Sequence, residues 1–300
     1  MHVIPRIALA ACAACWLAPA PAADAALDTA AIESITGLKG NYDAGEKVFK
    51  VSKPRDDVKV TVAGVPLPPF MGLSSWAAFT PMGRSAMLMG DTVLLEDEVN
   101  PAMSAALDAG LQVTALHNHF SSDQPRVYFM HIGGTGDPRQ LAMHVKAMYD
   151  RIAQVRAAAP APASASASAI PSPSNVSPQP LARILQAQPE TRDGMVKFTL
   201  GRRTRMHGVP VGNQMGVNTW AAFAGSDENA VVDGDFAMRE DDLQPVLKSM
   251  RGSGIEIVAI HQHMTHEVPR ILFLHYWGRG RASDLAGAVR RAFDSQHALQ

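Results

Sequence analysis

Short apolar runs separated by Gly and Pro dominate residues 58–133 and predict strands. Runs rich in apolar, β-branched and aromatic residues, with turn residues between them, are typical of strands. The expected strands are 58–64, 76–81, 86–95, 111–119 and 126–133.

Two stretches carry the signals of helix ends instead. Asn100 suits an N-cap, Pro101 suits the first helical position, and Gly110 is a typical stop. A second helix is expected to begin at Asp137 and to continue over residues 139–152, where apolar residues fall on one face. Strands and helices do not alternate as in a parallel α/β protein, so the predicted class is α+β with a mostly antiparallel sheet.

The same pattern occurs twice along the chain. The segment WAAF at residues 76–79 returns at 220–223, 144 positions later, and His117 returns as His261. No gap is needed between residues 64 and 142, where roughly a third of positions are identical, which indicates an internal duplication. We therefore predict two tandem copies of a mostly antiparallel sheet with two helices each.

Composition marks the boundary between the copies. Residues 157–180 are almost entirely Ala, Pro and Ser, and such a segment is typical of a disordered or semi-extended linker because it has almost nothing to bury. We expect the first repeat domain at 27–156 and the second at 181–300.

The first 25 residues have the layout of a secretory signal peptide. Arg6 precedes a short apolar run at 7–18, and small residues in an Ala-x-Ala pattern follow. That run is shorter than the ~20 residues that span a bilayer, and no later run is long enough. We expect a periplasmic or secreted protein without a transmembrane segment in the mature chain. A minor alternative is a lipoprotein anchored at Cys12, because LAAC at residues 9–12 resembles a lipoprotein cleavage box.

Charge and cysteine content exclude several classes of function. Lys plus Arg number 27 and Asp plus Glu number 28, without long runs of either sign, so we expect no nucleic-acid partner. Both cysteines, Cys12 and Cys15, lie in the expected signal peptide, which leaves the mature chain without a thiol ligand. The phosphate-loop and dinucleotide-binding motifs are absent, so no nucleotide or flavin cofactor is expected.

Six of the 11 histidines occur in two segments of one spacing, HNHFSSDQPRVYFMH at 117–131 and HQHMTHEVPRILFLH at 261–275. Residues two apart in a strand point to the same side, so each His-x-His pair could hold one ion, and a carboxylate follows each pair four positions later. Imidazole suits zinc and copper. The predicted metal ligands are His117, His119, Asp123, His261, His263 and Glu267.

The third histidine of each segment, His131 or His275, is a secondary candidate. If the two strands of the first copy form a hairpin, His131 lies opposite about Thr114, on the order of 15 Å from His119. His131 joins a site only if these strands are not partners, or if a pseudo-twofold axis brings it to the pair of the other copy.

Arg126 and Arg270 follow a proline at each loop exit, where a guanidinium could hold an anionic ligand. The alternative is a structural ion pair with Asp91 or Asp235, or with the acidic pairs at residues 96–97 and 240–241.

Glu96 and Glu240 are the candidate catalytic residues, because a carboxylate there could be a ligand or a general base. An acidic helix-entry turn explains them equally well, since the helix dipole favours negative charge at that end. Trp76 and Trp220 are expected in the core of each copy or, alternatively, in a groove.

The signal peptide, the two copies and the signatures HNHF…PRVYFMHIGG and HQHM…PRILFLHYWGRG resemble the LppY/LpqO family of exported bacterial proteins. The resemblance covers essentially the whole mature chain and implies an exported or lipoprotein-like protein, but no activity. A weaker resemblance to the cupins rests on the His-x-His-acid spacing, and it leaves a bicupin-like double β-barrel as the alternative fold.

Three hypotheses follow. The first is a metal-binding protein, either a carrier or a metal-dependent enzyme of unknown substrate. The second is a metal-free envelope module that binds a glycan, a peptidoglycan fragment or a small anion. The third is that the histidines serve only the fold.

Overall fold

The computed structural model describes residues 26–159 and 170–296. The expected signal peptide, including the Cys12 anchor site, lies outside the described residues, as do residues 160–169 of the expected linker. Within the two described segments, no helix has the length and apolar character needed to cross a membrane.

The first copy forms a six-stranded antiparallel sheet in the order β1-β2-β5-β6-β9-β7, with three α-helices. The strands are β1 (Gly40–Asp43), β2 (Val48–Pro54), β5 (Ser74–Met82), β6 (Ser85–Leu95), β7 (Gln112–His117) and β9 (Val127–Gly136). A separate three-stranded sheet contains β3 (Val60–Val62), β4 (Val65–Leu67) and β8 (Asp123–Gln124). The helices are α1 (Thr29–Thr36), α2 (Glu96–Asp108) and α3 (Pro138–Ala158).

The second copy repeats this plan, with the sheet order β10-β11-β14-β15-β18-β16. The strands are β10 (Pro189–Arg192), β11 (Met195–Gly201), β14 (Asn218–Gly225), β15 (Ala230–Arg239), β16 (Glu256–His261) and β18 (Ile271–Gly280). Its small sheet contains β12 (Thr204–Met206), β13 (Val209–Val211) and β17 (Glu267–Val268). The helices are α4 (Pro178–Leu185), α5 (Leu243–Gly252) and α6 (Ala282–Asp294).

The strand order confirms the duplicated α+β class. Over the described residues the sheets stay open and no barrel closes, so the bicupin-like alternative is wrong. Each copy has a third α-helix, α1 or α4, which the sequence analysis did not anticipate.

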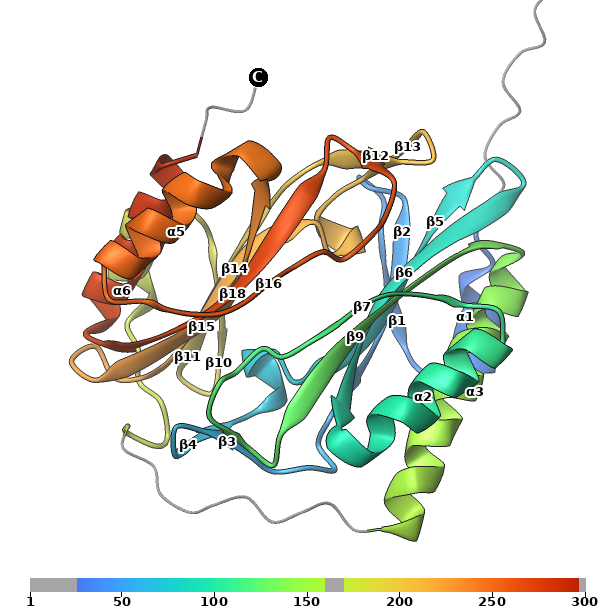
Figure 1. The fold of residues 1–300 in the computed structure, drawn as a ribbon, viewed down its shortest axis with the longest axis horizontal. Coiled ribbons are helices and arrows are strands. Elements are labelled where there is room, and N and C mark those ends of the chain that lie inside the picture. Colours follow the sequence, from blue (N-terminus) through green and yellow to red (C-terminus); the bar gives the residue numbers. More distant parts are fainter. Residues whose placement is uncertain (1–25, 160–169, 297–300) are drawn as a thin grey trace, which may run out of the picture.

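Each large sheet has an outer face covered by helices and an inner face that meets the other copy (Figure 1). Side chains alternate between the faces along every strand. In β9, Met130 and Ile132 pack outward with α2 and α3, whereas Phe129 belongs to a cluster shared with the second copy. The molecule is therefore a four-layer arrangement of helices, sheet, sheet and helices.

Two hairpins hold the copies together, and we call them the arms: β3–β4 of the first copy and β12–β13 of the second. Each arm packs its apolar residues on the inner face of the other copy's large sheet. The first arm contributes Val60, Val62 and Leu67 to a cluster with Ala222, Ala224 and Val231. The second contributes Met206 and Val211 to a cluster with Val48, Ala78 and Met87. Burial of such side chains contributes about 1.5–3 kcal/mol each, so the interface behaves as a core.

Two tryptophans, Trp76 and Trp220, each reach from their own copy to a glycine of the other copy. A Cβ placed on Gly216 would lie 2.6 Å from Cη2 of Trp76, and one placed on Gly72 would lie 3.2 Å from Cη2 of Trp220. Each tryptophan therefore needs a glycine on the opposite copy. Their ring faces carry lysines, with Lys50 Nζ 4.1 Å from the Trp76 ring and Lys197 Nζ 4.4 Å from the Trp220 ring.

The helix α2 begins five residues earlier than expected, at Glu96 rather than Pro101, and continues through Pro101. The reason is Glu98, whose buried carboxylate accepts a hydrogen bond from the Leu95 backbone N–H at 2.8 Å and so caps the helix. The guanidinium of Arg55 donates to both oxygens of Glu98, at 2.8 and 3.0 Å. This ion pair fixes the start of α2 against the chain that leaves β2.

Substitution of Gly216 by Ala is predicted to lower the free energy of unfolding by about 1–3 kcal/mol more than substitution of Gly208, because only the former overpacks the interface. Gly208 is the matched control: φ is 80° there and 78° at Gly216, but nothing lies within 4 Å of an added Cβ. Urea denaturation measures both variants. Equal losses would show that the Trp76 contact is not tight.

Glu98→Ala is predicted to lower the free energy of unfolding by about 3–5 kcal/mol, because it removes the buried carboxylate that pairs with Arg55 and Arg156 and leaves Arg55 only the half-exposed Asp57. The double variant Arg55→Met/Glu98→Leu removes both charges, and we expect it to recover most of that loss. Chemical denaturation followed by circular dichroism measures both variants. A double variant no more stable than the single one would contradict this account.

Candidate metal centre

Six histidines from the two copies meet at the interface between the inner faces, and we call His117, His119, His131, His261, His263 and His275 the histidine cluster. The first histidine of each segment ends an edge strand, β7 or β16, and the second follows two residues later. The third lies in the middle of β9 or β18, on the inner face. His119, His131, His263 and His275 are buried, and the remaining two are half-buried.

The rings pair across the two copies. The ring centroids of His117 and His261 are 3.7 Å apart, and these residues are equivalent positions of the repeat. His119 lies 3.4 Å from His275, and the symmetry-related pair His131 and His263 are 4.0 Å apart. A pseudo-twofold axis therefore passes between His117 and His261.

This arrangement decides the question of the third histidine. The strands β7 and β9 are indeed partners, with His131 opposite Ala115. Within one copy His131 is thus offset from His119, as the hairpin geometry predicted, although its ring lies 5.1 Å from that of His117. The alternative through the pseudo-twofold axis is the one observed, since His131 meets His263, and His275 meets His119.

Potential ligand atoms come close enough to share an ion. The nitrogens of His117, His119 and His275 lie within 4.8 Å of one another. Two further groups share His261. One contains His117, His131 and His261, and the other contains His261, His263 and Asp235.

Backbone carbonyls orient several of the rings. His275 Nδ1 lies 3.2 Å from the Gly234 carbonyl, and His263 Nδ1 lies 3.1 Å from that of Gly216. His131 hydrogen-bonds the backbone of Gly90. A carbonyl only accepts, so Nδ1 carries the proton and Nε2 keeps its lone pair, as in the second shells of metal-bound histidines. The Nε2 atoms of His117, His119, His131 and His275 are buried and have no hydrogen-bond partner.

Burial also favours the neutral imidazole that a metal requires. Desolvation, with repulsion from His263, lowers the pKa of His117 to about 3. Desolvation lowers the pKa of His119, His131, His261 and His275 well below the usual histidine range. Neutral imidazole is the ligand form, so these rings need not lose a proton to bind a metal at pH 7.

Two carboxylates at the cluster were not predicted as ligands. Asp91 lies opposite His131 in the register of β6 and β9, and Asp235 lies opposite His275 in that of β15 and β18. Burial, with the nearby Asp235 charge, raises the pKa of Asp91 to about 8. The signal was available in the sequence, since both aspartates recur at the repeat spacing, but sequence reasoning considered them only as partners of Arg126 and Arg270.

The predicted acidic ligands have another role. The Asp123 carboxylate accepts a hydrogen bond from the Val127 backbone N–H at 2.6 Å, and Glu267 accepts one from Ile271 at 3.2 Å. Both acids thereby close the loop between the second and third histidines. They are not brought into the ligand groups formed by the described residues.

The remaining candidates lie on the surface. Arg126 and Arg270 are exposed, and Arg270 donates to the Gln262 side chain at 2.5 Å rather than to an aspartate. Glu96 and Glu240 are exposed first residues of α2 and of the short helix Glu240–Asp242. Both glutamates therefore occupy the helix-entry position that the structural alternative described.

Solvent reaches the cluster between the edge strands. A pocket of about 410 Å³ lined by Thr114, Ile260 and His261 lies where β7 and β16 meet, and one of about 110 Å³ is lined by Gln112 and His263. The hydroxyl of Thr114 donates to the His263 carbonyl at 2.7 Å and joins the two edges there.

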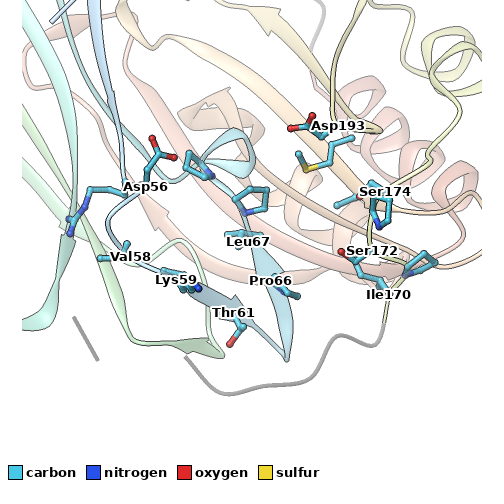
Figure 2. A pocket seen from close by; sticks show the side chains of 18 residues that line it. Asp56, Val58, Lys59, Thr61, Pro66, Leu67, Ile170, Ser172, Ser174 and Asp193 are labelled. Atoms are coloured by element: carbon cyan, nitrogen blue, oxygen red, sulfur yellow. The ribbon is translucent and has the colours of Figure 1, made fainter. Parts of the chain in front are cut away.

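A larger pocket of about 710 Å³ lies elsewhere, between the first arm and the second copy (Figure 2). Thr61, Pro66 and Leu67 line one side of it, and Ser172 and Asp193 line the other. The residues around this pocket include none of the six histidines, neither candidate arginine and neither cross-domain tryptophan.

Comparison with protein families assigns the chain to a family. The model of a family described as "Domain of Unknown Function (DUF1259)" matches residues 30–151 and again residues 179–295. The chain belongs to this family. Its two matches coincide with the two copies of the fold, and no curated protein matches the chain.

Solved structures with some likeness include bacterial microcompartment shell proteins. The trimeric shell protein PduB has 9% identity, with 85% of this chain and 89% of that chain covered and a TM-score of 0.22. EtuB from Clostridium kluyveri has 7% identity, the same coverages and a TM-score of 0.22. Scores this low carry no argument, and the fold is defined by its own strand order.

The tautomers provide a test of the site geometry. In protein freed of metal by a chelator, we expect the His131 and His275 rings to stay neutral at pH 5.5, with the proton on Nδ1, because burial lowers both pKa values and a backbone group holds each Nδ1. Histidine ¹⁵N spectra distinguish the two tautomers and the imidazolium. A protonated ring or the Nε2–H tautomer at either residue would contradict the geometry.

Proposed function

We propose that this duplicated protein binds divalent transition metal, zinc or copper, in the histidine cluster. Two triads related by the pseudo-twofold axis supply the ligands: His117, His119 and His275 form one, and His131, His261 and His263 form the other. The observation that carries the proposal is the convergence of imidazole nitrogens on both sides of the axis, where the Nε2 atoms of His117, His119, His131 and His275 are buried without a protein partner.

The donor set fits such an ion. Imidazole nitrogens bind zinc at about 2.0–2.1 Å, so two tetrahedral ligands lie about 3.3 Å apart. The Nε2 atoms of His261 and His263 are 3.1 Å apart, close to that value. Nitrogen-rich sites select zinc or copper over magnesium or calcium, which prefer oxygen.

Each triad takes two ligands from one copy and the third from the other, and this has a thermodynamic consequence. An ion bound to all three stabilises the packed arrangement of the copies over any opened one, by an amount that grows with its affinity. The protein therefore serves as a carrier that closes around its ion, or as an enzyme in which the pocket between β7 and β16 admits a substrate to an open coordination position.

The proposed cellular location rests on the sequence. The resemblance to the LppY/LpqO proteins and the signal-peptide pattern of the first 25 residues support export to the periplasm or the cell envelope. In that setting a site of histidines without cysteine is insensitive to oxidation to disulfide.

We expect protein purified without chelator or histidine tag to carry zinc or copper at one ion per triad, measured by elemental mass spectrometry. Removal of the metal should lower the melting temperature, since an ion at 100 times its Kd adds about 2.7 kcal/mol. His275→Ala should abolish binding at the triad whose other ligands are His117 and His119, and leave the other triad loaded.

The control is His144→Ala, which removes a histidine on α3, outside the cluster, and should leave the metal content unchanged. A wild-type protein that is empty and cannot be loaded with either metal would show the proposal to be wrong.

A further inference from the structure

Asp91 and Asp235 lie beside the histidine cluster, and their environment is unusual for aspartates. They are 8% and 3% exposed, they come from the central strands β6 and β15, and each has an Oδ1 atom without a hydrogen-bond partner. A buried carboxylate with an unsatisfied oxygen is costly, so it is kept only where another group uses that oxygen.

Asp235 contacts both sides of the axis. Through the sheet register it is the direct neighbour of His275, which belongs to the first triad. Its Oδ2 atom lies 3.1 Å from Nε2 of His263, which belongs to the second. Asp91 occupies the equivalent position beside His131, and it is close enough to Asp235 for the two charges to interact.

The hydrogen-bonding roles around His263 are decisive. Its Nδ1 faces the Gly216 carbonyl, which only accepts, so the neutral ring presents a lone pair at Nε2. That lone pair faces the Asp235 carboxylate and the Nε2 atom of His261, both at 3.1 Å. Electron pairs cannot face one another at this distance without a positive centre between them, either a proton or a metal ion.

We infer that Asp91 and Asp235 are shared ligands of the two triads, so that the cluster holds two divalent metal ions bridged by carboxylates. This inference rests on the proposed function and adds to it the coupling of the two ions and two further ligands. Two ions and two aspartates leave a net charge of +2, so an anionic ligand, such as hydroxide or a substrate oxyanion, is the class that the centre would accept.

The test uses the full chain and metal alone as the probe. Zinc titrations by calorimetry compare the wild type with Asp91→Asn and Asp235→Asn. We expect two ions in the wild type and at least about a tenfold loss of affinity in each variant, with both ions affected because each carboxylate is shared. The variants should fold, since the change removes repulsion between the two acids.

Asp233→Asn is the matched control. Asp233 is buried on the same face of β15, two residues from Asp235, and the charges of Lys197 and Asp235 act on it, but it joins none of the ligand groups among the described residues. Its substitution should therefore change the zinc affinity much less than Asp235→Asn does.

A second readout reports the bridge itself. With copper(II) loaded to saturation, two bridged ions couple magnetically, so the integrated electron paramagnetic resonance signal should fall below the copper content. The double variant Asp91→Asn/Asp235→Asn, which removes both bridges, should restore the missing signal in whatever copper it retains.

Failure of the proposed function and failure of this inference give different results. A wild type that takes up no metal defeats the proposed function and this inference with it. Two ions whose affinities do not change in either aspartate variant, or a single ion per chain, overturn the inference and leave metal binding in place. Full signal intensity from two copper ions likewise overturns the bridge.

Discussion

The contact between the inner faces of the two sheets is the interaction on which the rest of the structure depends. Each copy alone would expose apolar side chains of its inner face, and the two arms cover these faces reciprocally. With both flanks of the interface apolar, water reaches the centre only between the edge strands, and most of the polar residues there lose their hydration. Those residues are six imidazoles and two aspartates, whose buried electron pairs need a cation or protons as partners.

Much of the fold was readable from the sequence, and the reasons are local. The duplication, the strands of the large sheet and the helix that starts after Asp137 all follow from spacing and end signals, and Asp137 caps α3 as expected. The start of α2 was wrong because the capping residue, Glu98, is held by Arg55 from 43 positions away, and no local pattern reports such a partner. Helices α1 and α4 flank the regions used for the prediction.

The candidate site was likewise predicted only where local spacing specifies it. The His-x-His pairs could be identified because their spacing is short. The hairpin argument correctly offset His131 from His119, but the ring of His131 still lies 5.1 Å from that of His117 in the same copy. The pairing of His131 with His263 depends on how two sheets face each other, which one copy of the pattern does not encode. Asp123 and Glu267 matched a ligand spacing, yet the nearest unsatisfied groups were backbone N–H donors in the same loop.

Fusion of the copies in one chain permits differences that a symmetric dimer could not have. Near the axis, Met89 of the first copy corresponds to Asp233 in the second, Gly133 to Trp277, and Thr114 to Val258. The hydroxyl of Thr114 binds the His263 carbonyl, whereas valine offers no such donor on the other side. Asp233 adds a buried carboxyl group to only one half. The histidines and the Asp91–Asp235 pair remain the same in both copies while their surroundings have diverged, so two ions in this cluster would have unequal affinities although their histidine ligands match.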